Sequence, residues 1–323
     1  IQLVKDDYAL FTGNLFQQTG VTIHHSEVRD FLTGKPRRYD LIQLALMDAF
    51  NASASGLYAL NESYLYTVEA LQLYLRHLEA DGYLALTRWI KLPPRDTLKL
   101  FATAVSALRQ AGVNDPEQHL VLIRSWQTST LLVKNGSFTH RELSSVQRFC
   151  DERGFDLAYT PDIKPEQVKQ YNILSSPVFY QAANALLSEK SDSFMQQYKF
   201  NLQPATDDQP YFYQFYKWST LKEIFQLRNK GGMALLEWGY ITLIVTLGIA
   251  GFFSVVLILL PLWYYQRKQI TDNISIRRGD VFYYFFAIGL AFLFFEIAFM
   301  QKFILFLHQP IYAIAVILTA FLI

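Results

Sequence analysis

The sequence of 323 residues has little cysteine, almost no net charge and no glycine-rich turn. Its one cysteine, Cys150, excludes an intramolecular disulfide and a cysteine-based zinc site. Lys and Arg total 29 against 28 Asp and Glu, so the formal charge of +1 gives no electrostatic reason to expect a nucleic-acid partner. Charged residues make up 18% and aromatic residues 16%, and this composition excludes a wholly disordered chain.

Nucleoside and dinucleotide sites usually begin with a glycine-rich turn directly after the first strand. Here Gly13, Gly20 and Gly34 are scattered, and Gly231-Gly232 lies next to a long apolar run. The sequence therefore contains no direct cofactor fingerprint. Candidate site residues have to be sought among the polar side chains that follow predicted strands.

Charged residues nearly disappear after residue 235. Residues 238–266 contain no Asp, Glu, Lys or Arg, whereas a membrane-spanning helix needs about 20 apolar residues. We predict spans at about 239–263, 281–306 and 311–323. The last would rise only about 20 Å as a helix, less than the ~30 Å hydrocarbon core of a bilayer. We therefore expect this span to continue beyond residue 323.

One acidic residue, Glu296, falls inside the second predicted span. An ionisable side chain at mid-span costs about 2.5–3.5 kcal/mol on insertion scales, so it normally faces protein or water. Lys302 is displaced from Glu296 by about 600° around the helix, so the two residues do not share a face. The sequence leaves two interpretations of Glu296 open: a functional intramembrane residue or a polar contact between helices.

Strand-like and helical stretches alternate through the first 160 residues. Strands are predicted at 21–25, 39–44, 83–87 and 155–159, and a hairpin at 119–124 and 128–134. Helices are predicted at 3–18, 27–32, 61–78, 95–110 and 140–152, and further on at 178–187 and 194–198. We expect Asn61 to cap the helix at 61–78 and Asp81-Gly82 to form a turn before the strand at 83–87. The alternation is typical of βαβ units. It predicts an α/β fold with a doubly wound, mainly parallel sheet that binds ligands at the carboxyl ends of its strands.

Two acidic residues follow predicted strands. Glu27 comes after 21–25 and Asp48 after 39–44. In a doubly wound sheet both would face one crevice, where a carboxylate can accept hydrogen bonds from an adenine amino group, a ribose hydroxyl or an amine. The alternative interpretations are a helix-start carboxylate for Glu27 and a loop cap for Asp48.

The histidines and the cysteine give no catalytic signal. His24 and His25 are neighbours in a predicted strand, so their side chains would point to opposite faces and could not bind one metal ion. Cys150 lies in a predicted helix and fits a small core residue. We expect neither a metal site nor a thiol nucleophile. The aromatic run 211–216 fits either a membrane-interface belt or packing under the sheet.

Several segments resemble the spermidine synthases, the polyamine aminopropyltransferases. The soluble likeness is carried by Tyr39-Asp40-Leu41-Ile42, by the segment 61–70, and by Thr206-Asp207-Asp208-Gln209-Pro210-Tyr211-Phe212. Phe295-Glu296 through Phe306 is similar to the membrane part of bacterial proteins in which such a domain is fused to hydrophobic spans.

This resemblance implies three parts. Residues 1–160 would form a domain like the S-adenosylmethionine-dependent methyltransferases, truncated at its N-terminus so that the first strand and the glycine-rich turn are missing. Residues 161–235 would form a helical, aromatic-rich extension to the membrane, and residues 236–323 the transmembrane region. The protein would be an integral membrane protein of the bacterial inner membrane, with the soluble domain in the cytoplasm and the lipid bilayer as its partner.

The resemblance also implies a transferase that uses S-adenosylmethionine or decarboxylated S-adenosylmethionine as a substrate, with an unknown acceptor. Glu27 corresponds to the adenine-binding acid and Asp48 to the acid that holds the amine substrate. The position of the proton-accepting acid is Ala45, which cannot accept a proton. Ala45 favours an alternative, a non-catalytic regulatory or scaffolding membrane protein with a degenerate nucleoside-binding domain.

Overall fold

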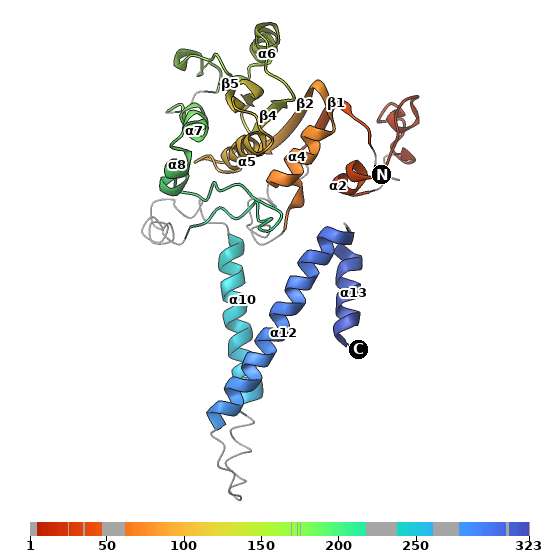
Figure 1. Ribbon diagram of the computed structural model, residues 1–323, viewed down its shortest axis with the longest axis vertical. Helices are drawn as coiled ribbons and strands as arrows, with labels where there is room; N and C mark the ends of the chain where they lie inside the picture. Colours follow the sequence, from red (N-terminus) through yellow and green to blue (C-terminus); the bar gives the residue numbers. More distant parts are fainter. Residues whose placement is uncertain are drawn as a thin grey trace, which may run out of the picture. The chain divides into compact units, whose positions relative to one another are not determined.

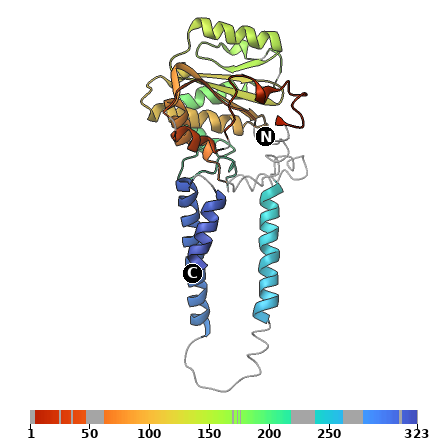
Figure 2. The same ribbon diagram turned by 90° about the vertical axis from the view of Figure 1, so that its right-hand side faces the viewer.

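The structure, a computed structural model, describes residues 5–24, 26–34, 36–46, 62–168, 170–172, 174, 176–217, 238–260, 278–307 and 310–322. The chain divides into two units. One unit comprises residues 36–273 and contains a mixed α/β domain, whose sheet and helices are drawn in Figures 1 and 2. The other comprises residues 1–35 and 274–323 and contains two apolar helices.

The described residues of the α/β domain form a five-stranded sheet in the order β1-β2-β4-β3-β5. Its strands are β1 (Tyr39–Leu44), β2 (Leu78–Trp89), β3 (Leu120–Arg124), β4 (Thr128–Lys134) and β5 (Asp156–Tyr159). Only β1 and β2 pair in parallel, whereas β2–β4, β4–β3 and β3–β5 pair antiparallel. The expectation of a mainly parallel sheet is therefore wrong.

The physical reason lies in the connections. Three residues join β3 to β4, and so short a link permits only a hairpin. Strands β4 and β5 are both antiparallel to β3, so they run in the same direction, and α6 (His140–Arg153) crosses between them. The predicted strand–helix–strand alternation is thus present here, but β3 lies between the two parallel strands and makes each adjacent pair antiparallel.

Helices cover both faces of the sheet (Figure 2). Helix α6 lies on one face, where it packs on Val121 of β3 and Leu157 of β5. Helices α4 (Val68–Arg76) and α5 (Asp96–Gln110) lie on the other, where α5 contacts β2 and β4. Strands β2 to β5 are therefore mostly buried, as expected for an α/β fold, whereas the edge strand β1 is largely exposed.

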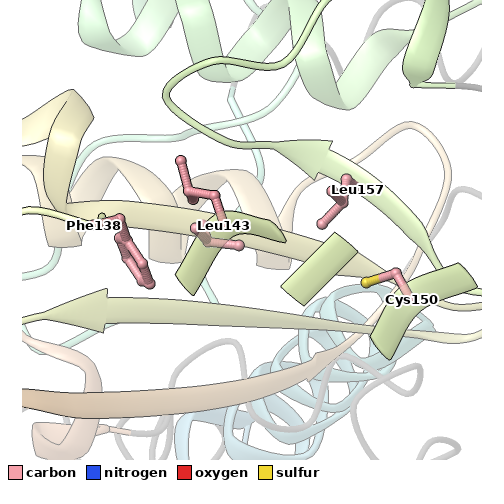
Figure 3. Close-up of a cluster of buried hydrophobic side chains, with 5 residues drawn as sticks. Phe138, Leu143, Cys150 and Leu157 are labelled. Atoms are coloured by element: carbon pink, nitrogen blue, oxygen red, sulfur yellow. The ribbon is translucent and has the colours of Figure 1, made fainter. Parts of the chain in front are cut away.

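Local sequence signals account for the bounds of α6. Thr139 and Glu142 form a capping box at its start, and Gly154 takes a left-handed conformation with φ 63° at its end. Its inner face adds Leu143 and Cys150 to a hydrophobic cluster with Val121, Phe138 and Leu157, drawn in part in Figure 3. The predicted helix at 140–152 is confirmed, and so is the core position of Cys150.

The burial of Cys150 leads to a chemical prediction. Burial raises the pKa of its thiol to about 11, so almost no reactive thiolate exists at neutral pH. We expect a maleimide to label the native protein at least about 100-fold more slowly than the protein in denaturant, because labelling requires local opening. Mass spectrometry of the single-cysteine chain measures both rates. Equal rates would contradict the core position.

Two predictions around the first crossover are corrected. Asp81-Gly82 is no turn before a strand, because β2 runs through both residues. Asp81 has φ 64°, and the pairing with β1 shifts between Tyr39 and Leu41, so the irregularity is a bulge inside the strand. A Cβ atom at Gly82 would lie 3.1–3.2 Å from three backbone oxygens, so a larger residue would require the backbone of the bulge to shift by a few tenths of an ångström.

The helix predicted at 61–78 is shorter in the structure, where α4 covers only Val68–Arg76. Thr67 accepts a hydrogen bond from the Ala70 amide and caps α4, and the short 3-10 helix η2 (Tyr64–Tyr66) precedes it. Asn61, the predicted cap, lies outside the described residues.

The helix predicted at 3–18 and the strand predicted at 21–25 are wrong where the structure describes these residues. Residues 6–18 form turns and the short 3-10 helix η1 (Leu15–Gln17) in place of a helix at 3–18, and residues 21–24 form no strand. Gly13 and Asn14 both have positive φ, at 63° and 53°, which interrupts a helix there. Extended residues become a strand only where a neighbour supplies hydrogen bonds. The helical turn at 27–32 is confirmed as α2 (Val28–Thr33).

Among the described residues, one helix is long and apolar enough to cross a membrane by length and composition. It is α12 (Arg278–Leu307), whose stretch Phe282–Ile304 has a mean hydropathy of 2.0 and none of its length buried. Helix α10 (Trp238–Ser254), which continues as a π-helical stretch at Val255–Leu259, and α13 (Pro310–Leu322) are shorter apolar helices. The three helices lie at the predicted spans, and residues 261–263 and 323 of those spans lie outside the described residues.

Helices α12 and α13 pack against each other (Figure 1). The ring of Phe321 lies 5.3 Å from that of Phe292 and 6.0 Å from that of Phe299, measured between centroids. Glu296 lies on α12 and is half-buried. Its functional interpretation stays a prediction.

Candidate functional site

The carboxyl ends of β1 and β2 meet at one edge of the sheet. The two strands are in register from Leu41 opposite Tyr83 to Leu44 opposite Leu86. In doubly wound sheets this edge holds the ligand. Ala45, directly after β1, is exposed there and offers only a methyl group. Asp48, the candidate amine-holding acid, lies outside the described residues.

Glu27 acts as the cap of helix α2. Its Oε2 atom accepts hydrogen bonds from the backbone amides of Arg29 at 2.8 Å and Asp30 at 3.4 Å. This is the helix-start interpretation of Glu27. The residue belongs to the unit formed by residues 1–35 and 274–323. Its adenine-binding role stays a prediction.

Two of the three segments of the soluble likeness, 61–70 and 206–212, contact each other at the start of α4. The Thr67 hydroxyl donates to Asp207 Oδ1 at 2.7 Å, and the Asp207 amide donates to Glu69 Oε2 at 2.9 Å. The Ser63 amide donates to the Pro210 carbonyl at 2.7 Å. Because α4 follows β1 along the chain, the segment 61–70 lies on the connection that leaves the carboxyl end of β1, and the segment 206–212 is bonded to it.

A buried group of charged side chains lies beside this edge, and sequence reasoning missed it. We name it the cation cluster: Arg88 near the end of β2, Arg95 just before α5, and Asp96 and Lys99 in its first turns. All four residues are at most 6% exposed. The cluster holds three basic groups and one acid, whereas charged residues are normally exposed or evenly paired.

Asp96 offsets part of the positive charge. Its Oδ1 atom lies 3.5 Å from Arg88 Nη2, and its Oδ2 atom lies 3.9 Å from Arg95 Nε. Arg88 Nη1 also donates to the Tyr66 hydroxyl at 3.1 Å. Lys99 Nζ donates to the backbone carbonyls of Tyr211 and Gln214, each at 3.1 Å. The cluster therefore ties β2, α5 and the aromatic run together.

Aromatic rings surround the remaining charge. The Arg88 guanidinium lies 4.8 Å from the ring centroid of Tyr66 and 5.4 Å from that of Phe212, and Lys99 Nζ lies 5.4 Å from that of Phe215. Ring faces attract cations, most strongly where water is excluded. Phe212 is fully buried and Phe215 is 1% exposed, so packing within the domain is the correct interpretation of the aromatic run 211–216.

Lys99 makes the stability of the domain depend on pH. Burial lowers its pKa from 10.5 to about 7, and the nearby Asp96 opposes this shift only in part. The unfolded chain therefore binds the proton more tightly than the folded chain, and stability rises with pH above about 7.

We expect the free energy of unfolding to rise between about pH 7 and pH 9, below the titration of tyrosine, by at most about 1.4 kcal/mol per pH unit from this group. Lys99→Met should remove that part of the slope. Urea denaturation of both proteins across the pH series is the measurement. Parallel slopes would show that Lys99 keeps its ordinary pKa.

The described part of the chain contains no candidate metal site. No group of three or more His, Cys, Asp and Glu residues there could hold a metal ion. The ring of His24 packs on that of Phe31, with centroids 4.6 Å apart, and His25 lies outside the described residues.

No protein-family model matches the chain, and no curated protein matches it.

Proposed function

We propose that this chain belongs to a membrane-anchored transferase with an S-adenosylmethionine-type α/β domain, similar to spermidine synthase, that alkylates an amine or a similar nucleophile. One observation carries the proposal. The parallel unit β1–α4–β2 has, at its carboxyl edge, the two hydrogen-bonded motifs that resemble that family. Ligands of doubly wound sheets bind at such an edge.

The proposed reaction needs little from the protein. The nitrogen lone pair attacks the carbon next to the sulfonium, a C–N bond forms, and the C–S bond breaks with its electrons left on sulfur as a neutral thioether. The amine then loses one proton. Most of the catalytic effect would come from alignment and from the exclusion of water. Asp48 would hold the amine and accept its proton, and Glu27 would bind the adenine.

Asp48→Asn tests this assignment. We expect transfer from S-adenosylmethionine or its decarboxylated form to fall at least about 100-fold, the usual effect of a lost general base. Binding of the nucleoside should change little, because Asp48 contacts only the acceptor in the proposal. Asp40→Asn is the matched control, since Asp40 is exposed on β1. Equal transfer rates in the wild type and in Asp48→Asn would contradict the role.

The alternative is a non-catalytic regulatory or scaffolding membrane protein. It is favoured by Ala45, whose methyl group stands where the family has its proton-accepting acid. This alternative predicts nucleoside binding without turnover of any amine, or no binding at all. Product analysis by mass spectrometry with a panel of polyamines separates the two functions.

The proposal places the protein in the bacterial inner membrane with the α/β domain in the cytoplasm, where S-adenosylmethionine is made. A cysteine introduced between residues 267 and 277, the loop after the first predicted span, should then react with an impermeant maleimide added outside the cell. The buried Cys150 contributes little background. Labelling only after cell lysis would show that this loop faces the cytoplasm, which contradicts the proposed orientation.

A further inference from the structure

A concave site lies at the other edge of the α/β domain, away from the carboxyl ends of β1 and β2. It is an open groove of about 450 Å³, and its polar lining comprises Arg38, Gln72, Arg76, Gln110 and Asn135. Arg38 directly precedes β1, and Arg76 ends α4 just before β2 begins at Leu78. The groove therefore lies at the amino ends of the parallel strands, whereas the proposed transferase site lies at their carboxyl ends.

The amide side chains of the groove are held by the protein. Gln72 Nε2 donates to Gln110 Oε1 at 3.0 Å, which joins α4 to α5. Asn135 Nδ2 donates to the backbone carbonyl of Glu79 at 2.9 Å. These bonds fix the walls of the groove and leave the two guanidinium groups as its main donors.

Neither guanidinium is engaged within the described part of the chain. Arg38 and Arg76 are exposed, and neither forms an ion pair or a hydrogen bond there, in contrast to Arg109, which donates to the Leu187 carbonyl at 2.7 Å. Asp81, at the bulge of β2, forms an ion pair with Lys134, whose Nζ atom lies 2.9 Å from Asp81 Oδ1. An arginine in the last turn of α4 also offsets the helix dipole. That effect explains Arg76 but not Arg38, which lies in no helix.

We propose that this groove binds a phosphomonoester through Arg38 and Arg76. Each guanidinium presents a planar set of donors that matches two phosphate oxygens, so a pair in one groove fits a doubly charged phosphate. The volume lies within the range of small-molecule sites. The ester can come from a soluble metabolite or from a lipid headgroup of the phosphatidic acid type, and both present the same phosphate to the two arginines.

The test uses the full chain in a neutral detergent. Calorimetry measures binding of inorganic phosphate, of glycerol phosphate and of a short-chain phosphatidic acid, with chloride as the counter-ion throughout. The variants are Arg38→Gln/Arg76→Gln and, for bidentate recognition, Arg38→Lys/Arg76→Lys. Arg141→Gln/Arg148→Gln is the matched control, because both residues are exposed on α6, on the other face of the sheet. Circular dichroism verifies that each variant is folded.

We expect at least one phosphate probe to bind at about 1 mM or below. The glutamine pair should weaken it about tenfold or more, since hydrogen bonds to charged groups are the strong ones, and the lysine pair should weaken it less. The control pair should bind like the wild type. If only phosphatidic acid binds, the groove is a site for a lipid headgroup. If glycerol phosphate binds as well, the groove is a site for a soluble metabolite. No binding of any probe by the wild type, or equal binding by the folded glutamine pair, would overturn the proposal. Neither result depends on nucleoside binding at the carboxyl edge.

Discussion

Asp156→Ala should destabilise the α/β domain by about 3–5 kcal/mol, the usual cost of breaking a buried ion pair from one side. Asp156 begins β5, and its side chain is fully buried. Its Oδ2 atom lies 2.7 Å from Arg124 Nη2, and its two oxygens accept the backbone amides of Gln170, Tyr171 and Asn172 at 2.8–3.1 Å. Without the carboxylate, three backbone amides lose their partner and the buried guanidinium of Arg124 loses its counter-charge.

The same residue contributes to acid sensitivity. Burial tends to raise the pKa of Asp156, but the amides of Tyr171 and Asn172 outweigh it and hold the pKa below its usual range. Its stabilisation is therefore complete above the ordinary aspartate pKa, about 3.9, and is lost as the pH falls through the lower folded pKa.

Chemical denaturation of the full chain in detergent, followed by tryptophan fluorescence, measures the loss. Glu189→Ala is the control, because Glu189 is exposed and the described residues give it no ion pair. We expect the control to stay within about 0.5 kcal/mol of the wild type. A similarly small change for Asp156→Ala would show that the buried pair is not formed.

Arg88→Met should cost about 3 kcal/mol or more, because it leaves the carboxylate of Asp96 buried without its closest cation. The Tyr66 hydroxyl also loses the donor that lies 3.1 Å away. Methionine fills much of the space of the arginine stem, so the charge rather than the cavity dominates the effect.

A second substitution separates the charge from the packing. Arg88→Met/Asp96→Asn removes the stranded carboxylate, and we expect it to recover part of the loss, since buried pairs can often be replaced by neutral residues at little cost. The double-mutant cycle in urea gives the coupling between the two residues. Zero coupling, or a harmless Arg88→Met, would contradict the account of the cation cluster.

The parts of the fold that were predictable have their signals within a few residues. Helix α6 carries its capping box at Thr139 and its terminating Gly154, and helix α7 has the predicted bounds, Val178–Leu187. The hairpin of β3 and β4 follows from two apolar alternations joined by three residues. In each case the local pattern and the tertiary packing favour the same conformation.

The direction of the strands could not be predicted, because side-chain alternation is the same in parallel and antiparallel pairs. The insertion of β3 between β4 and β5 depends on contacts between residues far apart in the sequence. The bulge at Asp81-Gly82 has the sequence of a turn and differs from one only through its pairing with β1.

The candidate site was predicted least well, for a physical reason. Basic residues such as Arg88, Arg95 and Lys99 are normally exposed to solvent. Their burial depends on the aromatic run, some 110 residues further along the chain, whose rings face the cations. One signal was available: Arg88 continues the alternation of Leu84 and Leu86 on the buried face of β2. Glu27 was predicted as a site residue, but a carboxylate just before a helix can equally well cap that helix, and Glu27 caps α2.

Titration calorimetry of the full-length protein with S-adenosylmethionine and its decarboxylated form tests the central claim most directly. The account predicts that one of them binds with a dissociation constant in the micromolar range, roughly −8 kcal/mol. It also predicts that Arg38→Gln/Arg76→Gln, at the other edge, leaves this binding unchanged. A full-length, folded protein that binds neither nucleoside would contradict the transferase assignment.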